Sequence, residues 1–273
     1  MRRLLLTAFF ALVFAAAAIA AALEMPSETP DAKDAFIKGA ITVKGEGYAP
    51  DKPMSEAQKR MLAMRAAKTT ALREIAEVLG GVAVTGDTTV ENAAASSDVV
   101  RTSVQGLVKG AQVIKEIYDP VNATAVVYVS VPVSGIAGAL LPYFSSDESP
   151  RFQPLVSQPG LSHDGLIVDA RGTGFRPALI NRIITQGGEV LYDPSKAAPE
   201  VVAENGPAAY TDSIDKAFAM LLKRGSANPL VVKAAGATRA TDAELGPEEA
   251  SAVFSSNQTG RFFVNAKVVF VLN

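Results

Sequence analysis

The sequence of 273 residues contains no cysteine and no tryptophan, and its only histidine is His163. Without cysteine the chain can form no disulfide, no thiolate metal site and no cysteine nucleophile, and it has no cysteine to acylate, so we expect no lipid anchor. One histidine is too few for a histidine-based metal centre. A Ser-His-Asp triad could use only His163 as its base. Because His163 lies in a Ser/Pro-rich stretch, we expect it to be an ordinary surface residue.

Motifs of common catalytic and nucleotide-binding sites are missing as well. The chain has no G-x-S-x-G nucleophile elbow, no H-E-x-x-H zinc motif and no P-loop. The sequence therefore predicts no catalytic residue, no metal and no cofactor, and we expect a protein that is not an enzyme.

The N-terminus has the order of a secretory signal peptide. Two arginines follow Met1, and no charged residue occurs from Leu4 to Leu23. Small residues at Ala18, Ala20 and Ala22 provide the A-x-A pattern that precedes cleavage. We therefore expect residues 1–22 to be a signal peptide and the protein to be periplasmic, with outer-membrane association left open. A retained membrane anchor is the alternative, because about 20 apolar residues can span a bilayer.

The signal peptide gives a direct prediction for the exported protein. Since the small-residue pairs end at Ala20 and Ala22, the mature N-terminus is expected to be Ala21 or Leu23. N-terminal peptide mass spectrometry of the envelope fraction checks this. Recovery of an intact Met1 there would contradict it.

The net charge is small and weakly acidic. The chain has 26 Lys and Arg against 28 Asp and Glu. Removing the two arginines of the signal peptide leaves 24 against 28, a formal charge of minus 4. This balance argues against nucleic acid or an anionic lipid surface as the main partner.

Hydrophobic periodicity over residues 36–133 predicts a small α+β domain with the order strand, helix, strand, helix, strand, strand. The expected elements are a strand at 37–43 ended by Gly45 and Gly47, a helix from 55 to about 79, a strand at 82–90, a helix at 98–109 and a hairpin at 111–133. Ser96-Ser97-Asp98 offers an N-cap for the helix at 98–109, and Gly110 is expected to end it. Residues 24–35 have no apolar periodicity and predict a flexible lead-in.

The long helix has the clearest local signals. Ser55 and Gln58 form a capping-box pattern at its start, and Gly80-Gly81 is expected to end it through a positive φ. Three- and four-residue steps predict a core-facing stripe, made of Met61, Met64, Ala67, Ala71, Ile75 and Val78.

Proline and serine predict a linker over residues 134–164, followed by a second α+β domain at 165–273. The expected elements there are a strand at 165–169, a hairpin across 179–192 around Gly187-Gly188, a helix at 210–224 with Phe218 on its buried face, and strands at 229–235 and 261–272. Four acidic residues are expected to lie in a solvated segment near a helix N-terminus: Asp242, Glu244, Glu248 and Glu249.

One loop is a candidate anion or ligand site. Asp169 to Gly174 follows a buried strand, and its candidate residues are Asp169, Arg171, Gly172 and Gly174. The loop lacks the third glycine of a dinucleotide fingerprint and the lysine of a P-loop. The alternative is a structural turn in which Arg171 pairs with a local carboxylate.

Residues 36–133 resemble the Lpp-twenty lipoprotein family and the N-terminal domain of flagellar assembly protein T. The resemblance is carried by the Ala-rich helical run at 63–77, by Thr89-Val90, by the run at 99–102 and by the run at 106–111. Residues 165–273, with the opening Gly165-Leu166-Ile167-Val168-Asp169, resemble uncharacterised envelope relatives. The sequence departs from the lipoprotein members because it has no cysteine to acylate.

The resemblance implies a scaffold or assembly role at the periplasmic or outer-membrane side, with no catalytic residue. Its expected partners are other envelope or flagellar proteins, and self-association and a link to the flagellum stay open. The alternative is a periplasmic small-ligand-binding protein or enzyme with a pocket near Asp169 and Arg171.

Overall fold

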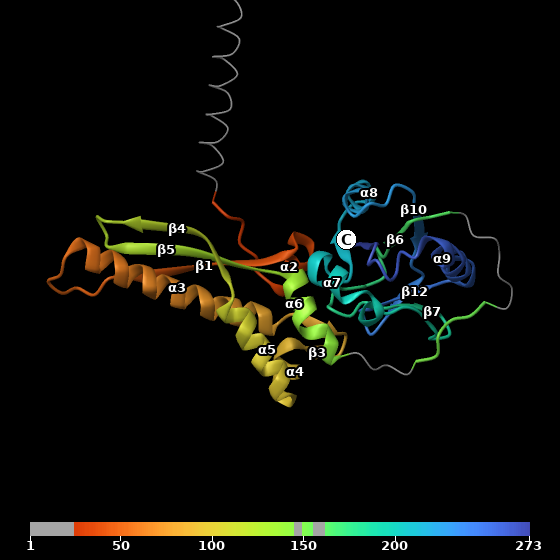
Figure 1. Ribbon diagram of the computed structural model, residues 1–273, viewed down its shortest axis with the longest axis horizontal. Helices are drawn as coiled ribbons and strands as arrows, with labels where there is room; N and C mark the ends of the chain where they lie inside the picture. The colour runs from red at the N-terminus through yellow and green to blue at the C-terminus, as the bar shows by residue number, and fades with distance from the viewer. Residues whose placement is uncertain (1–24, 145–148, 155–161) are drawn as a thin grey trace, which may run out of the picture.

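The computed structural model describes residues 25–144, 149–154 and 162–273. The protein has an α+β fold with two sheet-bearing regions, as the sequence predicts (Figure 1). The expected signal peptide at 1–22 lies outside the described residues. Among those described, no helix has both the length and the apolar character needed to span a membrane.

The first region is a three-stranded antiparallel sheet covered on one face by a long helix. The sheet order is β1 (Ala40–Tyr48), β5 (Thr124–Pro132) and β4 (Gln112–Asp119). Helix α3 (Glu56–Gly80) runs along one side of this sheet, as Figure 1 shows. The capping box of Ser55 and Gln58 is present, so the local signal at the start of this helix is confirmed.

Glycine has a different role in β1 from the expected one. Gly45 and Gly47 were predicted to end the strand, but β1 continues through both of them. A Cβ atom on Gly45 would lie 2.2 Å from the backbone oxygen of Ala67, and one on Gly47 would lie 2.2 Å from the backbone nitrogen of Ala67. These glycines therefore let the strand and the helix backbone approach more closely than any side chain would allow.

The buried stripe of α3 includes Ala67, Ala71 and Ile75, as predicted, and three of its five members are alanine. Its members are Ala63, Ala67, Ala71, Ile75 and Leu79. Met61, predicted to face the core, is 63% exposed. Close strand packing leaves no room for methionine there, so alanine occupies the contact and the larger side chain turns to solvent. Gly81 caps the helix at φ −74°, so the predicted positive φ is also wrong.

The chain enters this region through a helix that the sequence did not predict. Residues 32–35, assigned to the lead-in, begin α2 (Ala32–Lys38), which Asp31 caps by accepting from the backbone N–H of Asp34. Gly39 then turns the chain into β1 with φ +76°. Ile37, predicted to start the strand, lies in this helix.

Two short strands and two helices complete the first region. They are β2 (Ala83–Thr85), β3 (Thr88–Thr89), α4 (Val90–Ser96) and α5 (Asp98–Lys109). The cap of α5 at Ser97 and its end at Gly110 are as predicted. The predicted strand at 82–90 is a bulged hairpin, and α4 was not expected.

The first part of the predicted linker is helical. Residues 133–143 form α6 (Val133–Leu140) and the short 3₁₀ helix η1 (Leu141–Tyr143). Ile136, Leu140 and Leu141 are buried. Burial of these apolar side chains in the core stabilises the helix, whereas the proline and serine residues that predicted a linker lie mostly after it.

The second region contains two four-stranded sheets. One is parallel throughout and has the order β10 (Pro229–Lys233), β6 (Gly165–Asp169), β13 (Val268–Val271) and β9 (Ala209–Thr211). The other is mixed and has the order β11 (Gly236–Thr238), β12 (Asp242–Leu245), β7 (Ile183–Thr185) and β8 (Val190–Tyr192). The predicted strand at 165–169 and the hairpin around Gly187-Gly188 are confirmed.

The helices of this region are η2 (Pro194–Lys196), α7 (Pro199–Asn205), α8 (Ile214–Lys223) and α9 (Pro247–Gly260). The helix predicted from 210 begins only at Ile214, because Tyr210 belongs to β9. Phe218, expected in its buried face, is 42% exposed. The C-terminal strand begins at Val268 and not at 261, because α9 ends there and a turn with Ala266 at φ +46° intervenes.

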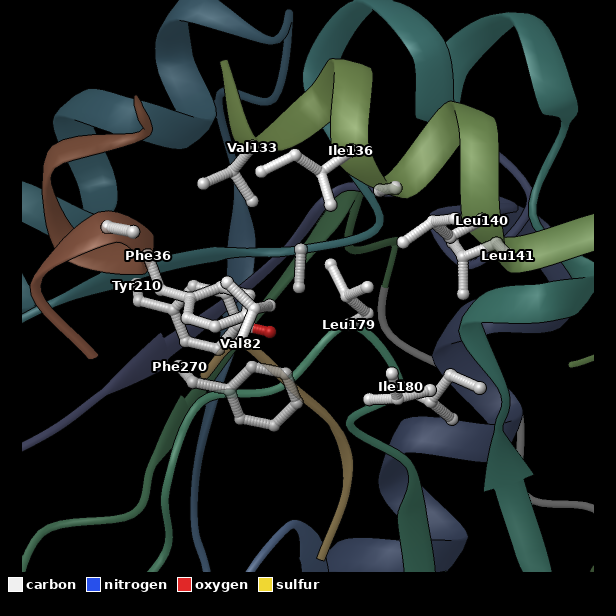
Figure 2. Packing of buried hydrophobic residues seen from close by; sticks show 14 of the residues in the cluster. Phe36, Val82, Val133, Ile136, Leu140, Leu141, Leu179, Ile180, Tyr210 and Phe270 are labelled. Carbon is white, nitrogen blue, oxygen red and sulfur yellow. The ribbon is translucent and has the colours of Figure 1, made fainter. Parts of the chain in front are cut away.

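The two regions share one hydrophobic core. Figure 2 shows Phe36 and Val82 beside Tyr210 and Phe270, with side chains of α6 above Leu179. The ring of Phe36 meets Tyr210 edge-on at 5.3 Å between centroids. Backbone bonds continue the contact, because the N–H groups of Leu179 and Ile180 donate to the carbonyls of Ala83 and Val84, each at 2.9 Å. The core is therefore continuous between the regions.

Candidate functional site

The predicted ligand loop begins where β6 ends, at the carboxyl edge of the parallel sheet. Open parallel sheets commonly bind ligands at this edge. Here Arg171 folds back on Asp169: Nε donates to Oδ1 at 2.8 Å, Nη2 donates to Oδ2 at 2.7 Å, and the backbone N–H donates to Oδ1 at 3.2 Å. The hydrogen bond from Arg171 holds the pKa of the Asp169 carboxyl below its usual range. The two charged groups of the loop thus neutralise each other.

The rest of the loop is closed by its own hydrogen bonds. Thr173 Oγ1 donates to the carbonyl of Ala170 at 2.7 Å and accepts from the N–H of Phe175 at 3.2 Å. Gly172 and Gly174 have φ of +77° and +76°. Glycine adopts such a positive φ without steric cost, so the shape of the turn accounts for both glycines. The geometry is that of the alternative interpretation, a structural turn with Arg171 paired locally.

His163 lies just before β6, at the start of the second region. Its Nδ1 atom is 3.2 Å from the carbonyl oxygen of Asn228. Nearby, Asp164 accepts from the hydroxyl of Ser226 at 2.7 Å and from the N–H groups of Ala227 and Asn228. These bonds fasten the entry of β6 to the loop before β10.

The position of Asp242 differs from the one expected from the sequence. It was expected in a solvated segment, but it is buried and forms a two-point ion pair with Arg182, with Nε to Oδ1 at 3.1 Å and Nη2 to Oδ2 at 2.7 Å. The parallel pairing of β12 with β7 brings these two distant residues together. The bond to Asp242 raises the pKa of Arg182. Glu248 and Glu249 do lie in the first turn of α9, where the helix dipole favours acids.

A buried polar network connects the two sheets of the second region. Asn181 Oδ1 accepts from the hydroxyl of Tyr210 at 2.6 Å and from the N–H of Ala178 at 2.7 Å. Its Nδ2 donates to the carbonyls of Arg176 and Thr241. Burial raises the pKa of Tyr210. Because every hydrogen-bonding group of this asparagine has a partner, the network holds the core together.

The second region has a cavity away from the Asp169 loop. It has a volume of about 440 Å³ and opens between β8, η2 and the C-terminal end of α9. Its lining combines cations, amides and aromatic rings, and the residues that matter below are Arg151, Tyr192, Lys196, Asn257, Arg261 and Phe263. The sequence did not predict this cavity because its wall comes from three separate segments, at 149–151, 190–196 and 257–264, none of which contains a motif.

Metal binding has no obvious location. Among the residues that the structure describes, no group of three or more histidine, aspartate or glutamate side chains lies close enough to hold a metal ion.

Comparison with known proteins concerns the second region. Curated proteins give no match to the chain. Residues 165–273, from the first residue of β6 to the C-terminus, match the family model for the second domain of Treponema pallidum Tp0624. The second region, with its parallel and mixed sheets, is therefore similar to the second domain of Treponema pallidum Tp0624.

Proposed function

We propose that this protein is a non-catalytic, exported protein of the bacterial envelope that acts as a scaffold or assembly factor on the periplasmic or outer-membrane side. The resemblance of residues 36–133 to the Lpp-twenty family and to flagellar assembly protein T supports this role. Other envelope or flagellar proteins are the expected partners.

The observation that carries the proposal is the Asp169–Arg171 pair. An enzyme built on a parallel sheet normally keeps polar groups free at the carboxyl edge to face a substrate. In this protein the carboxylate and the guanidinium at that edge bind each other through both oxygens of Asp169. This arrangement supports a structural part for the loop and favours association over chemistry at this place.

Single-residue variants test the proposal in cells. In a strain whose deletion has a measurable envelope or motility phenotype, genes encoding Asp169→Ala, Arg171→Ala or His163→Ala should restore the wild type, because none of these residues is expected to act on a substrate. Immunoblots and melting temperatures of the purified variants provide the control for abundance and stability. If Asp169→Ala or Arg171→Ala fails at normal abundance and unchanged melting temperature, the scaffold role is wrong and a site at the loop takes its place.

Location and partners are tested separately. Cell fractionation should find the mature protein in the periplasm or with the outer membrane. Crosslinking in intact cells should then capture the same envelope or flagellar protein in wild type and in the Arg171→Ala variant. Retention in the cytoplasm would contradict the export part of the proposal without bearing on the fold.

A further inference from the structure

We propose that the cavity between β8, η2 and α9 binds an organic anion that carries carboxylate or phosphate groups. This proposal goes beyond the scaffold role and does not depend on it. It rests on the charge of the cavity, on the kind of hydrogen-bonding groups left in it, and on its size and aromatic wall.

Positive charge is concentrated in the cavity. Among the residues that the structure describes, the lining contains Arg151, Lys196 and Arg261 and a single carboxylate, that of Asp193. None of the three cations forms an ion pair with another residue that the structure describes. A cationic cavity on a weakly acidic chain selects for anions.

The hydrogen-bonding groups point to the same ligand. Asn257 Oδ1 accepts from the N–H of Phe263 at 3.0 Å, and Asp193 Oδ1 accepts from the N–H of Ser195 at 2.9 Å. These two acceptor atoms are thus engaged within the protein, whereas the Nδ2 group of Asn257 and the three cations remain as donors. A lining with this excess of donors suits a ligand rich in oxygen acceptors.

Size and shape require more than an inorganic ion. A volume of about 440 Å³ lies within the range of small-molecule sites, which is roughly 300–1,000 Å³. Tyr192 and Phe263 stack with 4.9 Å between ring centroids and form an apolar wall, to which Val190 and Val264 add. A ligand with a carbon skeleton can cover this wall while its acidic groups meet the cations.

Hydrogen bonds hold the backbone of the segments that carry Arg151 and Arg261. On one side of Arg151, the carbonyl of Pro150 accepts from the N–H of Val190 at 2.8 Å, and on the other the N–H of Phe152 donates to the carbonyl of Val190 at 3.1 Å. Arg261 follows α9 with φ +48°, and its carbonyl accepts from Asn265 Nδ2 at 2.9 Å. Preorganisation of this kind lowers the cost of binding.

Calorimetric titration of the full mature protein tests the proposal. The probes are citrate, a tricarboxylate, and glucose 6-phosphate, a phosphate monoester, each at matched ionic strength. We expect saturable binding of at least one probe, and its identity distinguishes carboxylate from phosphate recognition. The variant Arg151→Gln/Lys196→Gln/Arg261→Asn should lose about tenfold or more in affinity, because charge-assisted hydrogen bonds are the strongest available here. Asparagine is chosen at 261 because it tolerates a positive φ.

A matched variant separates a specific site from general electrostatics. Arg65→Gln/Lys68→Gln/Arg73→Gln removes the same charge from exposed positions of α3 and should change the affinity by less than about twofold. Equal losses in the two triple variants would overturn the proposal, as would the absence of saturable binding of both probes by wild type. Binding of inorganic phosphate as tight as that of either probe would overturn its organic part. If the melting temperature of the triple cavity variant is lower than that of the wild type, the single variant Lys196→Gln replaces it, because Lys196 lies at the exposed end of η2.

Discussion

Replacing Gly45 by alanine is expected to destabilise the protein by about 3 kcal/mol or more, a large part of the stability of an ordinary domain. The added Cβ would lie 2.2 Å from the backbone oxygen of Ala67 and 2.3 Å from the backbone nitrogen of Ala71. No side chain can rotate away to relieve this, because both atoms belong to the main chain of α3. Helix and strand must separate, and the packing of the first region loosens. Urea unfolding followed by far-UV circular dichroism measures the change.

Gly106→Ala is the matched control for that experiment. Gly106 lies inside α5, and a Cβ atom there would have nothing within 4 Å. The same substitution should therefore stabilise the protein by about 0.5–1 kcal/mol, since alanine restricts the unfolded chain and favours a helix. The two changes should move the unfolding midpoint in opposite directions. A Gly45→Ala protein as stable as the wild type would show that the close approach of β1 to α3 is wrong.

Replacing Asp242 by leucine is expected to cost about 3–5 kcal/mol. The side chains of Arg182 and Asp242 are only 10% and 4% exposed, so the guanidinium would lose its two-point acceptor in a place that water hardly reaches. Desolvation of a buried charge is expensive when its counter-charge is removed. The stability of β7 and β12, the two parallel strands that carry the pair, should fall with it.

The double variant Arg182→Met/Asp242→Leu shows whether the cost comes from removing the counter-charge of Arg182. Because both charges are gone, this variant should recover much of the lost stability, and a thermodynamic cycle over the four proteins gives the coupling energy. Chemical unfolding at one pH provides all four values. A loss below about 1 kcal/mol in Asp242→Leu would mean that the guanidinium finds water or another acceptor and that the pair is weak.

Local sequence signals predicted a large part of the fold correctly. The capping box at Ser55, the cap at Ser97, the strand at 165–169 and the hairpin of β4 and β5 all depend on neighbours along the chain. Each of these signals works through a bond or a periodicity within a few residues. For this reason these local signals do not depend on how distant parts of the chain pack.

The candidate sites were harder to predict. Asp169 and Arg171 are two positions apart, so a local pair was a foreseeable alternative to a ligand site. Asp242 was misjudged because its partner Arg182 is 60 residues away and charge alone does not show burial. The cavity at β8 was missed because Arg151, Lys196 and Arg261 come from separate segments. Proximity between such residues is created only by folding.

The sequence by itself determined the α+β class, the ends of α5 and the start of α3, because caps and periodicity are local properties of the chain. Only the tertiary structure decided that Gly45 and Gly47 lie against the backbone of α3 and that Ala63 is buried where Met61 was expected, since those choices depend on how closely two elements approach. It also decided that α6 packs into a core shared by both regions. The burial of apolar surface between distant segments is a property of the whole chain, which no short window of sequence contains.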